Sequence, residues 1–203
     1  MSAPVSAPVE EAIGAALRGE LIVLPTDTVY GIGTRPDLPE ATASLFDAKG
    51  RPRELQLPVL VPSAASAADV AQLDDQAHRL AEALWPGALT LVLPRTSESH
   101  TWELGGDPHT VGVRVPRHPL ALAVLGGTGP LAVTSANRSG RPTPSDCGEL
   151  AAVFGAAVSV YLCEETPLSG LASTVVDLAH GAPAILREGA IRERTILEIL
   201  SDV

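Results

Sequence analysis

Short apolar runs recur along this chain, and each of them ends at a proline, a glycine or a polar cluster. Runs of this length and composition predict buried β-strands. Because only 3% of the residues are aromatic, the core is expected to consist of Ala, Val, Leu and Ile. Strands are predicted at residues 21–24, within 26–33, and at 58–61, 88–93, 110–115, 131–134, 158–162, 173–178 and 184–187.

Helical periodicity separates these runs at several places. Helices are predicted at residues 9–18, 38–49, 67–85, 120–125, 145–154 (with Ser145 as N-cap) and 194–200. The strands are too numerous and too close together for a strict alternation of strand and helix. We therefore predict an α/β (α+β mixed) fold, a twisted mixed β-sheet with surrounding helices. Residues 1–8 are expected to form a flexible N-terminus and residues 9–203 a single domain.

Composition and charge limit the classes of partner. The formal net charge of −10 argues against a broad, non-specific grip on nucleic acid. No stretch of about 18 consecutive apolar residues occurs and the start lacks a signal-peptide pattern, so a cytoplasmic location without membrane contact is expected. Cys147 and Cys163 stand alone, with no CxxC motif and no dense cysteine framework, which indicates neither a zinc ribbon nor a disulfide scaffold and fits a reducing compartment. The histidines lack metal-ligand spacing, so no metal site is predicted.

The usual phosphate-binding loops are absent from the sequence. No GxxxxGK[ST] occurs, and residues 31–36 break the GxGxxG pattern at its last glycine. A nucleotide would therefore be held by dispersed cations, hydroxyls and backbone amides. Residues 49–53, 134–140 and 187–189 offer such groups, and each segment follows a predicted strand or helix, so they could meet at one cleft. Each also has a purely structural explanation: helix-terminal charge, a self-satisfied turn and an exposed ion pair.

Lys49 is the only lysine among the 14 basic residues of the chain. A single lysine in a chain that otherwise uses arginine hints at a point charge that a planar guanidinium would supply less well. The alternative is a drift of composition that happened to retain one lysine.

Seven blocks, in order, resemble the YrdC-like family of threonylcarbamoyl-AMP synthases, in its short, single-domain TsaC type. The blocks are LPTDTVYG at 24–31, KGRPRELQLPVLV at 49–61, LWPGALTLVLP at 84–94, VGVRVPRHPLA at 111–121, AVTSANRSGRPTP at 132–144, STVVDL at 173–178 and ILREGAI at 185–191. The resemblance covers about residues 10–192. It implies a twisted sheet around a central basic cavity in which ATP, L-threonine and bicarbonate meet.

The resemblance also implies a reaction and its partners. The threonine amine captures bicarbonate or CO2, and the resulting carbamate attacks the α-phosphate of ATP with release of pyrophosphate. Mg²⁺ would enter with ATP, held mainly by phosphate oxygens and water. The product would pass to a downstream threonylcarbamoyl transferase complex of the TsaB/TsaD/TsaE type for tRNA t6A37 modification, and structured RNA or tRNA is a possible partner.

Site residues are implied position by position. Threonine binding falls to Thr28, Tyr30, Arg114, Thr134 and Ser173, with Arg114 on the carboxylate. Nucleotide binding falls to Lys49, Arg51, Ser135, Asn137 and Arg187, of which the first four would also be catalytic. The chain departs from many family members at Gln56, where they have Pro, and at Ala172, where they have Glu, which puts closure of the loop at 169–173 in question.

Two other readings stay open. One is an RNA-binding module without catalysis, which the net charge disfavours. The other is a YciO-type paralogue, or a free-standing relative of the carbamoyl-adenylate domain of hydrogenase-maturation proteins. The intact KGR segment at 49–51 and SAN segment at 135–137 favour the synthase over these relatives.

Overall fold

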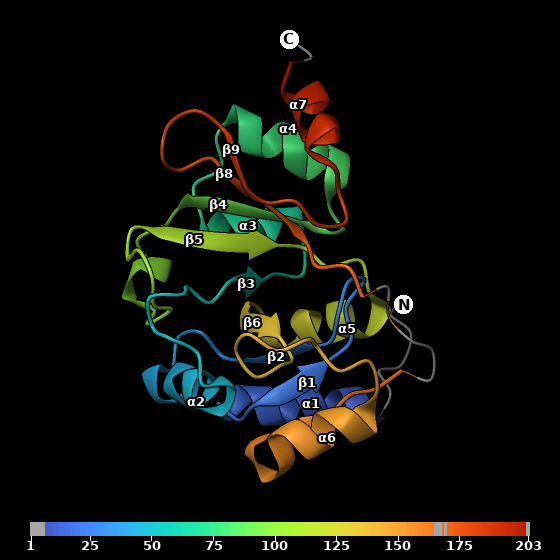
Figure 1. Cartoon of the computed structure of the whole chain (residues 1–203). Helices are drawn as coiled ribbons and strands as arrows, with labels where there is room; N and C mark the ends of the chain where they lie inside the picture. The colour runs from blue at the N-terminus through green and yellow to red at the C-terminus, as the bar shows by residue number, and fades with distance from the viewer. Residues whose placement is uncertain (1–6, 165–167, 169, 202–203) are drawn as a thin grey trace, which may run out of the picture.

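A nine-stranded mixed β-sheet forms the centre of the protein in a computed structural model that describes residues 7–164, 168 and 170–201 (Figure 1). The strands follow the order β7-β1-β2-β6-β3-β5-β4-β8-β9. The pairs β1–β7, β3–β5 and β4–β8 are parallel and the others antiparallel. The strands are β1 (Ile22–Leu24), β2 (Gly31–Thr34), β3 (Val59–Leu60), β4 (Leu89–Pro94), β5 (Thr110–Arg114), β6 (Leu131–Ser135), β7 (Val160–Tyr161), β8 (Thr174–Asp177) and β9 (Ala184–Arg187).

Helices surround this sheet. They are α1 (Ala7–Leu17), α2 (Pro39–Lys49), α3 (Ala64–Val70), α4 (Asp75–Leu84), α5 (Pro119–Thr128), α6 (Cys147–Phe154) and α7 (Glu193–Ser201), with short 3-10 turns at Ser99–Thr101 and Gly155–Ala157. In Figure 1, α4 and α7 lie beside β4, β8 and β9, whereas α1, α2 and α6 lie at the opposite end of the molecule. No helix in the described part of the chain is both long and apolar enough to cross a membrane.

Alternating side chains divide the core into two clusters. Ile22 and Leu24 of β1 pack with α1 and α5, whereas Val23 between them belongs to the larger cluster. In the other half of the sheet, buried residues of α3, α4 and α7 pack against every second residue of β4 and β5. Because successive side chains of a strand point to opposite faces, the residues between those core positions face away from these helices.

The expected α/β class and the positions of all predicted strands are confirmed. The single helix predicted at residues 67–85 is wrong, because two helices occupy this region. Ala71 is extended and pairs with Arg95, and the Asp74 side chain accepts a hydrogen bond from the Ala77 backbone N–H, which starts α4. A side chain that caps a helix start competes with continuation of the preceding helix.

Three smaller expectations change as well. The N-cap of α6 is Asp146 and not Ser145, since the Asp146 carboxylate accepts from the Glu149 backbone N–H. Cys147 and Cys163, which indicated no disulfide scaffold in the sequence, form one disulfide, with Cα atoms 6.0 Å apart, a separation typical of such bonds. Of the N-terminus predicted to be flexible, residues 1–6 lie outside the described residues, whereas residues 7–8 belong to α1.

Candidate active site

A cavity of about 800 Å³ lies on the face of the sheet that α3, α4 and α7 leave uncovered. Its floor is built with the two-residue period of strands: Thr90 and Val92 of β4, and Gly112 and Arg114 of β5, line it. The volume is within the range of small-molecule sites. The sequence predicted a cleft at the strand ends, whereas the structure places the cavity across the sheet face, with strand-end loops as its walls.

The structure brings most of the predicted site residues to this one cavity. Those that line it are Thr28, Tyr30, Arg51, Arg114, Thr134, Ser135, Asn137, Ser173 and Arg187. They come from segments that lie far apart in the sequence, which is the convergence expected from the three polar segments. Lys49 differs, because it lies beneath the cavity wall and is only 2% exposed.

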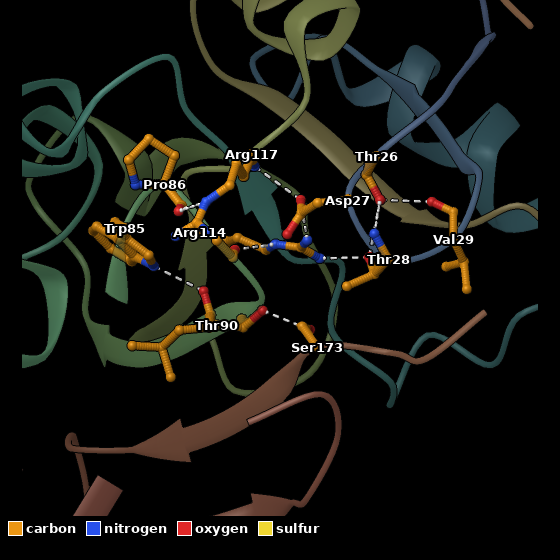
Figure 2. Close-up of polar contacts among 12 residues, drawn as sticks. Thr26, Asp27, Thr28, Val29, Trp85, Pro86, Thr90, Arg114, Arg117 and Ser173 are labelled. Atoms are coloured by element: carbon orange, nitrogen blue, oxygen red, sulfur yellow. Dashed lines mark hydrogen bonds and ion pairs between the residues drawn. The ribbon is translucent and has the colours of Figure 1, made fainter. Parts of the chain in front are cut away.

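Arg114, the last residue of β5, is buried in the floor of the cavity and only 6% exposed. Its guanidinium donates from Nε to the Gly87 carbonyl oxygen at 2.9 Å, from Nη1 to Thr28 Oγ1 at 2.9 Å and from Nη2 to Asp27 Oδ1 at 2.6 Å (Figure 2). Burial lowers the pKa of Arg114, and the neighbouring Asp27 opposes that shift. The arrangement holds a planar cation in one orientation.

Thr28 is oriented by its neighbour Thr26. Thr26 Oγ1 donates its only proton to the Val29 carbonyl oxygen at 2.6 Å, so in the 2.9 Å contact between the two hydroxyls Thr28 is the donor. The Thr28 oxygen is then directed to accept from Arg114. The loop between β1 and β2 therefore presents its hydroxyls to the arginine in a fixed pattern.

Lys49 supports the loop that follows β6. Its ammonium donates to the carbonyl oxygens of Ser135 at 2.5 Å and Asn137 at 2.7 Å, and lies 3.3 Å from Asn137 Oδ1. Burial lowers the pKa of Lys49 to about 7, and the charge of Arg51 adds to the effect. The end of α2 thus contributes a cation under the loop formed by residues 135–137, called the SAN loop below. The predicted direct contact of Lys49 with a triphosphate stays a prediction.

Arg51 and Arg187 come from segments far apart in the sequence, and both line the cavity close enough for their charges to interact. Arg51 donates to the backbone oxygens of Leu55 and Gln56, which shape the turn after α2. Arg187 donates to Ser173 from Nε and from Nη2. Burial lowers the pKa of both arginines, and the charge of Arg187 adds to the shift of Arg51. Two neighbouring cations with incomplete solvation favour an anionic ligand between them.

The central basic cavity implied by the resemblance is not confirmed. Arg51, Arg114, Arg141 and Arg187 line the cavity, but so do Glu54, Asp107 and Asp177. Two of these acidic side chains meet at His180, which bridges Asp177, at 2.8 Å, and Asp107, at 3.2 Å. These two carboxylates raise the pKa of His180. Within the described residues, no group of three or more His, Cys, Asp or Glu could hold a metal ion.

Several cavity residues escaped the sequence analysis. Thr90 accepts or donates a 2.9 Å hydrogen bond with Ser173, and its signal was a lone hydroxyl within the apolar run of β4. The Gln56 side chain, which the sequence marked only as a departure, donates to the carbonyl oxygens of Asp107 and Thr110. Tyr30, by contrast, was predicted, and its hydroxyl accepts a 3.0 Å hydrogen bond from the backbone N–H of Glu164. Asp27, which lies beside the cavity, had no signal apart from its place in the LPTDTVYG block.

The sequence profile of the Sua5/YciO/YrdC family, described as telomere recombination, matches residues 15–189. The chain belongs to this family. A Sua5/YciO/YrdC relative from Mycobacterium tuberculosis is 42% identical over 93% of this chain and 87% of its own. A relative from Pyrococcus abyssi, named threonylcarbamoyl-AMP synthase, is 34% identical over 95% of this chain, which spans only 57% of that relative.

Solved structures of the Sua5/YciO/YrdC family agree with the fold. Pyrococcus abyssi Sua5, in a structure described as complexed with L-threonine, matches 96% of this chain with a TM-score of 0.86 and 31% identity. The chain covers 58% of that protein. Escherichia coli YciO matches 94% of this chain and 93% of its own length, with a TM-score of 0.85 and 26% identity.

Proposed function

We propose that this chain is a threonylcarbamoyl-AMP synthase. It converts L-threonine, bicarbonate or CO2, and ATP into L-threonylcarbamoyl-adenylate and pyrophosphate, the first step of tRNA t6A37 modification, and is therefore a nucleotidyltransferase. The observation that carries the proposal is the convergence of Arg114, Arg51 and Arg187 with the SAN loop in one cavity. Relatives named for this activity and the threonine complex of the Pyrococcus protein support it.

The reaction divides the cavity into two regions. Arg114 and Thr28 take the carboxylate end of threonine, whereas Arg51, Arg187 and the SAN loop take the phosphates of ATP. The carbamate formed on the threonine amine attacks the α-phosphate, and pyrophosphate leaves. Such a reaction requires positioning and neutralisation of charge. Mg²⁺ would enter with ATP, held mainly by phosphate oxygens and water, and would neutralise charge on the phosphates.

The product of the proposed reaction indicates where the protein acts and which enzymes act after it. We propose a cytoplasmic protein whose product is consumed by a threonylcarbamoyl transferase complex. The net charge of −10 disfavours a broad phosphate grip on tRNA.

Pyrophosphate release tests the function directly. Purified protein with ATP, Mg²⁺, bicarbonate and L-threonine should release pyrophosphate only when threonine is present, and mass spectrometry should detect threonylcarbamoyl-adenylate. Serine and carbamoyl phosphate serve as alternative substrates in parallel reactions. Release driven by carbamoyl phosphate without threonine would favour the hydrogenase-maturation chemistry, and RNA retention without any nucleotide turnover would favour a binding module.

The pH dependence of the KM for ATP should report on Lys49. Below a pKa of about 7 the ammonium donates to the SAN loop, and above it the amine has lost one donor. The KM for ATP should therefore rise with pH through about 7, by up to about tenfold per pH unit. Lys49→Met should have a high KM with a flatter profile, whereas Arg53→Met, in the same loop, should keep the wild-type slope. Equal slopes in all three proteins would contradict a titrating Lys49.

A further inference from the structure

The Asp27 carboxylate joins two distant parts of the chain beside the cavity. Its Oδ1 atom accepts from Arg114 Nη2 at 2.6 Å and from the backbone N–H of Arg117 at 2.8 Å (Figure 2). Asp27 lies in the loop between β1 and β2, whereas Arg114 ends β5 and Arg117 follows it. One carboxylate oxygen thus fixes both the loop that carries Thr28 and the position of the guanidinium.

The contact leaves part of the guanidinium available. Among the described residues, Arg114 donates one N–H to each of Gly87, Thr28 and Asp27. A guanidinium has five N–H donors, so one remains on each of the terminal nitrogens Nη1 and Nη2. Arg114 lines the cavity, and one N–H on each terminal nitrogen can serve the two oxygens of a carboxylate.

A merely structural ion pair would look different. A buried arginine paired only for charge balance commonly uses both terminal nitrogens on both oxygens of its partner. The surface pair of Arg35 and Asp37 comes close to this, because two guanidinium nitrogens contact the two carboxylate oxygens. Arg114 instead donates to a single oxygen of Asp27, and its other two hydrogen bonds are donated to the Thr28 hydroxyl and the Gly87 carbonyl oxygen. The guanidinium is clamped on three sides and keeps donors for a ligand.

We propose that Asp27 is a positioning residue that fixes the guanidinium of Arg114, so that its remaining N–H groups bind the carboxylate of the amino-acid substrate. The inference rests on the proposed function and deepens it. A consequence is a strict requirement for the substrate carboxylate. Asp27 does not touch the substrate, and its effect on binding passes through Arg114.

Asp27→Asn tests the proposal, because it keeps the shape and removes the charge. Replacing a charge-assisted hydrogen bond by a neutral one should raise the KM for threonine about tenfold. The KM for ATP should stay within about twofold of wild type, since the nucleotide does not use Arg114. The matched control is Asp37→Asn, which removes an aspartate paired with an arginine outside the cavity and should leave both KM values unchanged.

L-Threoninol, which lacks the carboxylate, distinguishes a loss of Arg114 positioning from a general loss of structure in the cavity. As a competitor of threonine in pyrophosphate release, it should inhibit wild type and Asp27→Asn at similar concentrations. In an Arg114→Ala background, adding Asp27→Asn should cause no further rise in the KM for threonine. Both readouts isolate an effect that passes through the guanidinium, which a loss of overall structure would not reproduce.

The outcomes are distinguishable. If wild type releases pyrophosphate with threonine but Asp27→Asn leaves the KM for threonine unchanged, the inference is overturned and the proposed function stands. If threoninol loses affinity as much as threonine does, Asp27 shapes the cavity generally and the inference is also overturned. If the wild-type protein releases no pyrophosphate with threonine, the proposed function fails. The inference is then tested by calorimetry, which compares the binding of threonine and of threoninol to the same variants. Asp27→Ser replaces Asp27→Asn if the latter does not fold.

Discussion

Arg114→Ala is expected to raise the KM for threonine by about a hundredfold, with the KM for ATP changed less than about threefold. The variant removes two donors to the substrate carboxylate, and charge-assisted hydrogen bonds contribute about 1.5–3 kcal/mol each. It also leaves Asp27, whose side chain is only 16% exposed, without its cation. Initial rates of pyrophosphate release, measured over a matrix of threonine and ATP concentrations, give both constants.

Arg117→Ala is the matched control for this prediction. Arg117 is three residues from Arg114, and its side chain donates to the Pro86 carbonyl oxygen, while the bond to Asp27 comes from its backbone N–H and survives the substitution. Its KM for threonine should stay within about threefold of wild type. If Arg114→Ala raised the two KM values equally, the carboxylate role of Arg114 would be wrong.

Gly189→Ala is expected to lower the free energy of unfolding by about 3 kcal/mol. A Cβ at Gly189 would overlap the Ala172 carbonyl oxygen and would lie 2.6 Å from the carbonyl carbon of Ser173, and backbone atoms cannot yield as a flexible side chain can. Relief of the clash has to displace Ser173, which directly precedes β8 and lines the cavity, so the KM for threonine should rise as well. Urea denaturation gives the stability, and the pyrophosphate assay gives the KM.

Gly126→Ala, a comparable substitution, is expected to change the free energy of unfolding in the opposite direction. Gly126 lies within α5, and nothing stands within 4 Å of a Cβ at this position. Alanine favours a helix over glycine by about 0.5–1 kcal/mol, so this variant should be more stable than wild type. A Gly189→Ala protein as stable as wild type would contradict the close packing of residues 172–173 against residue 189.

The fold was largely predictable because strands of this protein are short apolar runs with clear ends. The helix predicted at residues 67–85 failed because apolar spacing continues through the break, and only the Asp74 cap and the pairing of Ala71 with Arg95 divide it. Capping is decided by a few atoms, whereas periodicity averages over many residues. The disulfide between Cys147 and Cys163 was equally hidden, because spacing in sequence does not report proximity in space.

The site was predictable in its membership but not in its geometry. Polar segments at the ends of strands and helices indicated Ser135, Asn137 and Arg187, and family resemblance added Arg114. Neither source could place Lys49 under the SAN loop, since the direction of a lysine side chain depends on the packing around its helix. Asp27 was missed because an acidic residue beside a threonine has many ordinary explanations, and its partners lie 87 and 90 residues away.

The order of strands in the sheet determines how late in folding the protein can bind its ligands. The parallel pair of β1 and β7 joins Ile22 to Val160, and the bond between Thr90 and Ser173 spans 83 residues. Loops of this size must close, at a cost in chain entropy, before the contacts between their ends can stabilise the fold, and this slows folding. The cavity should therefore be among the last features to form during refolding, and ligand binding should lag behind the burial of the tryptophans, Trp85 and Trp102.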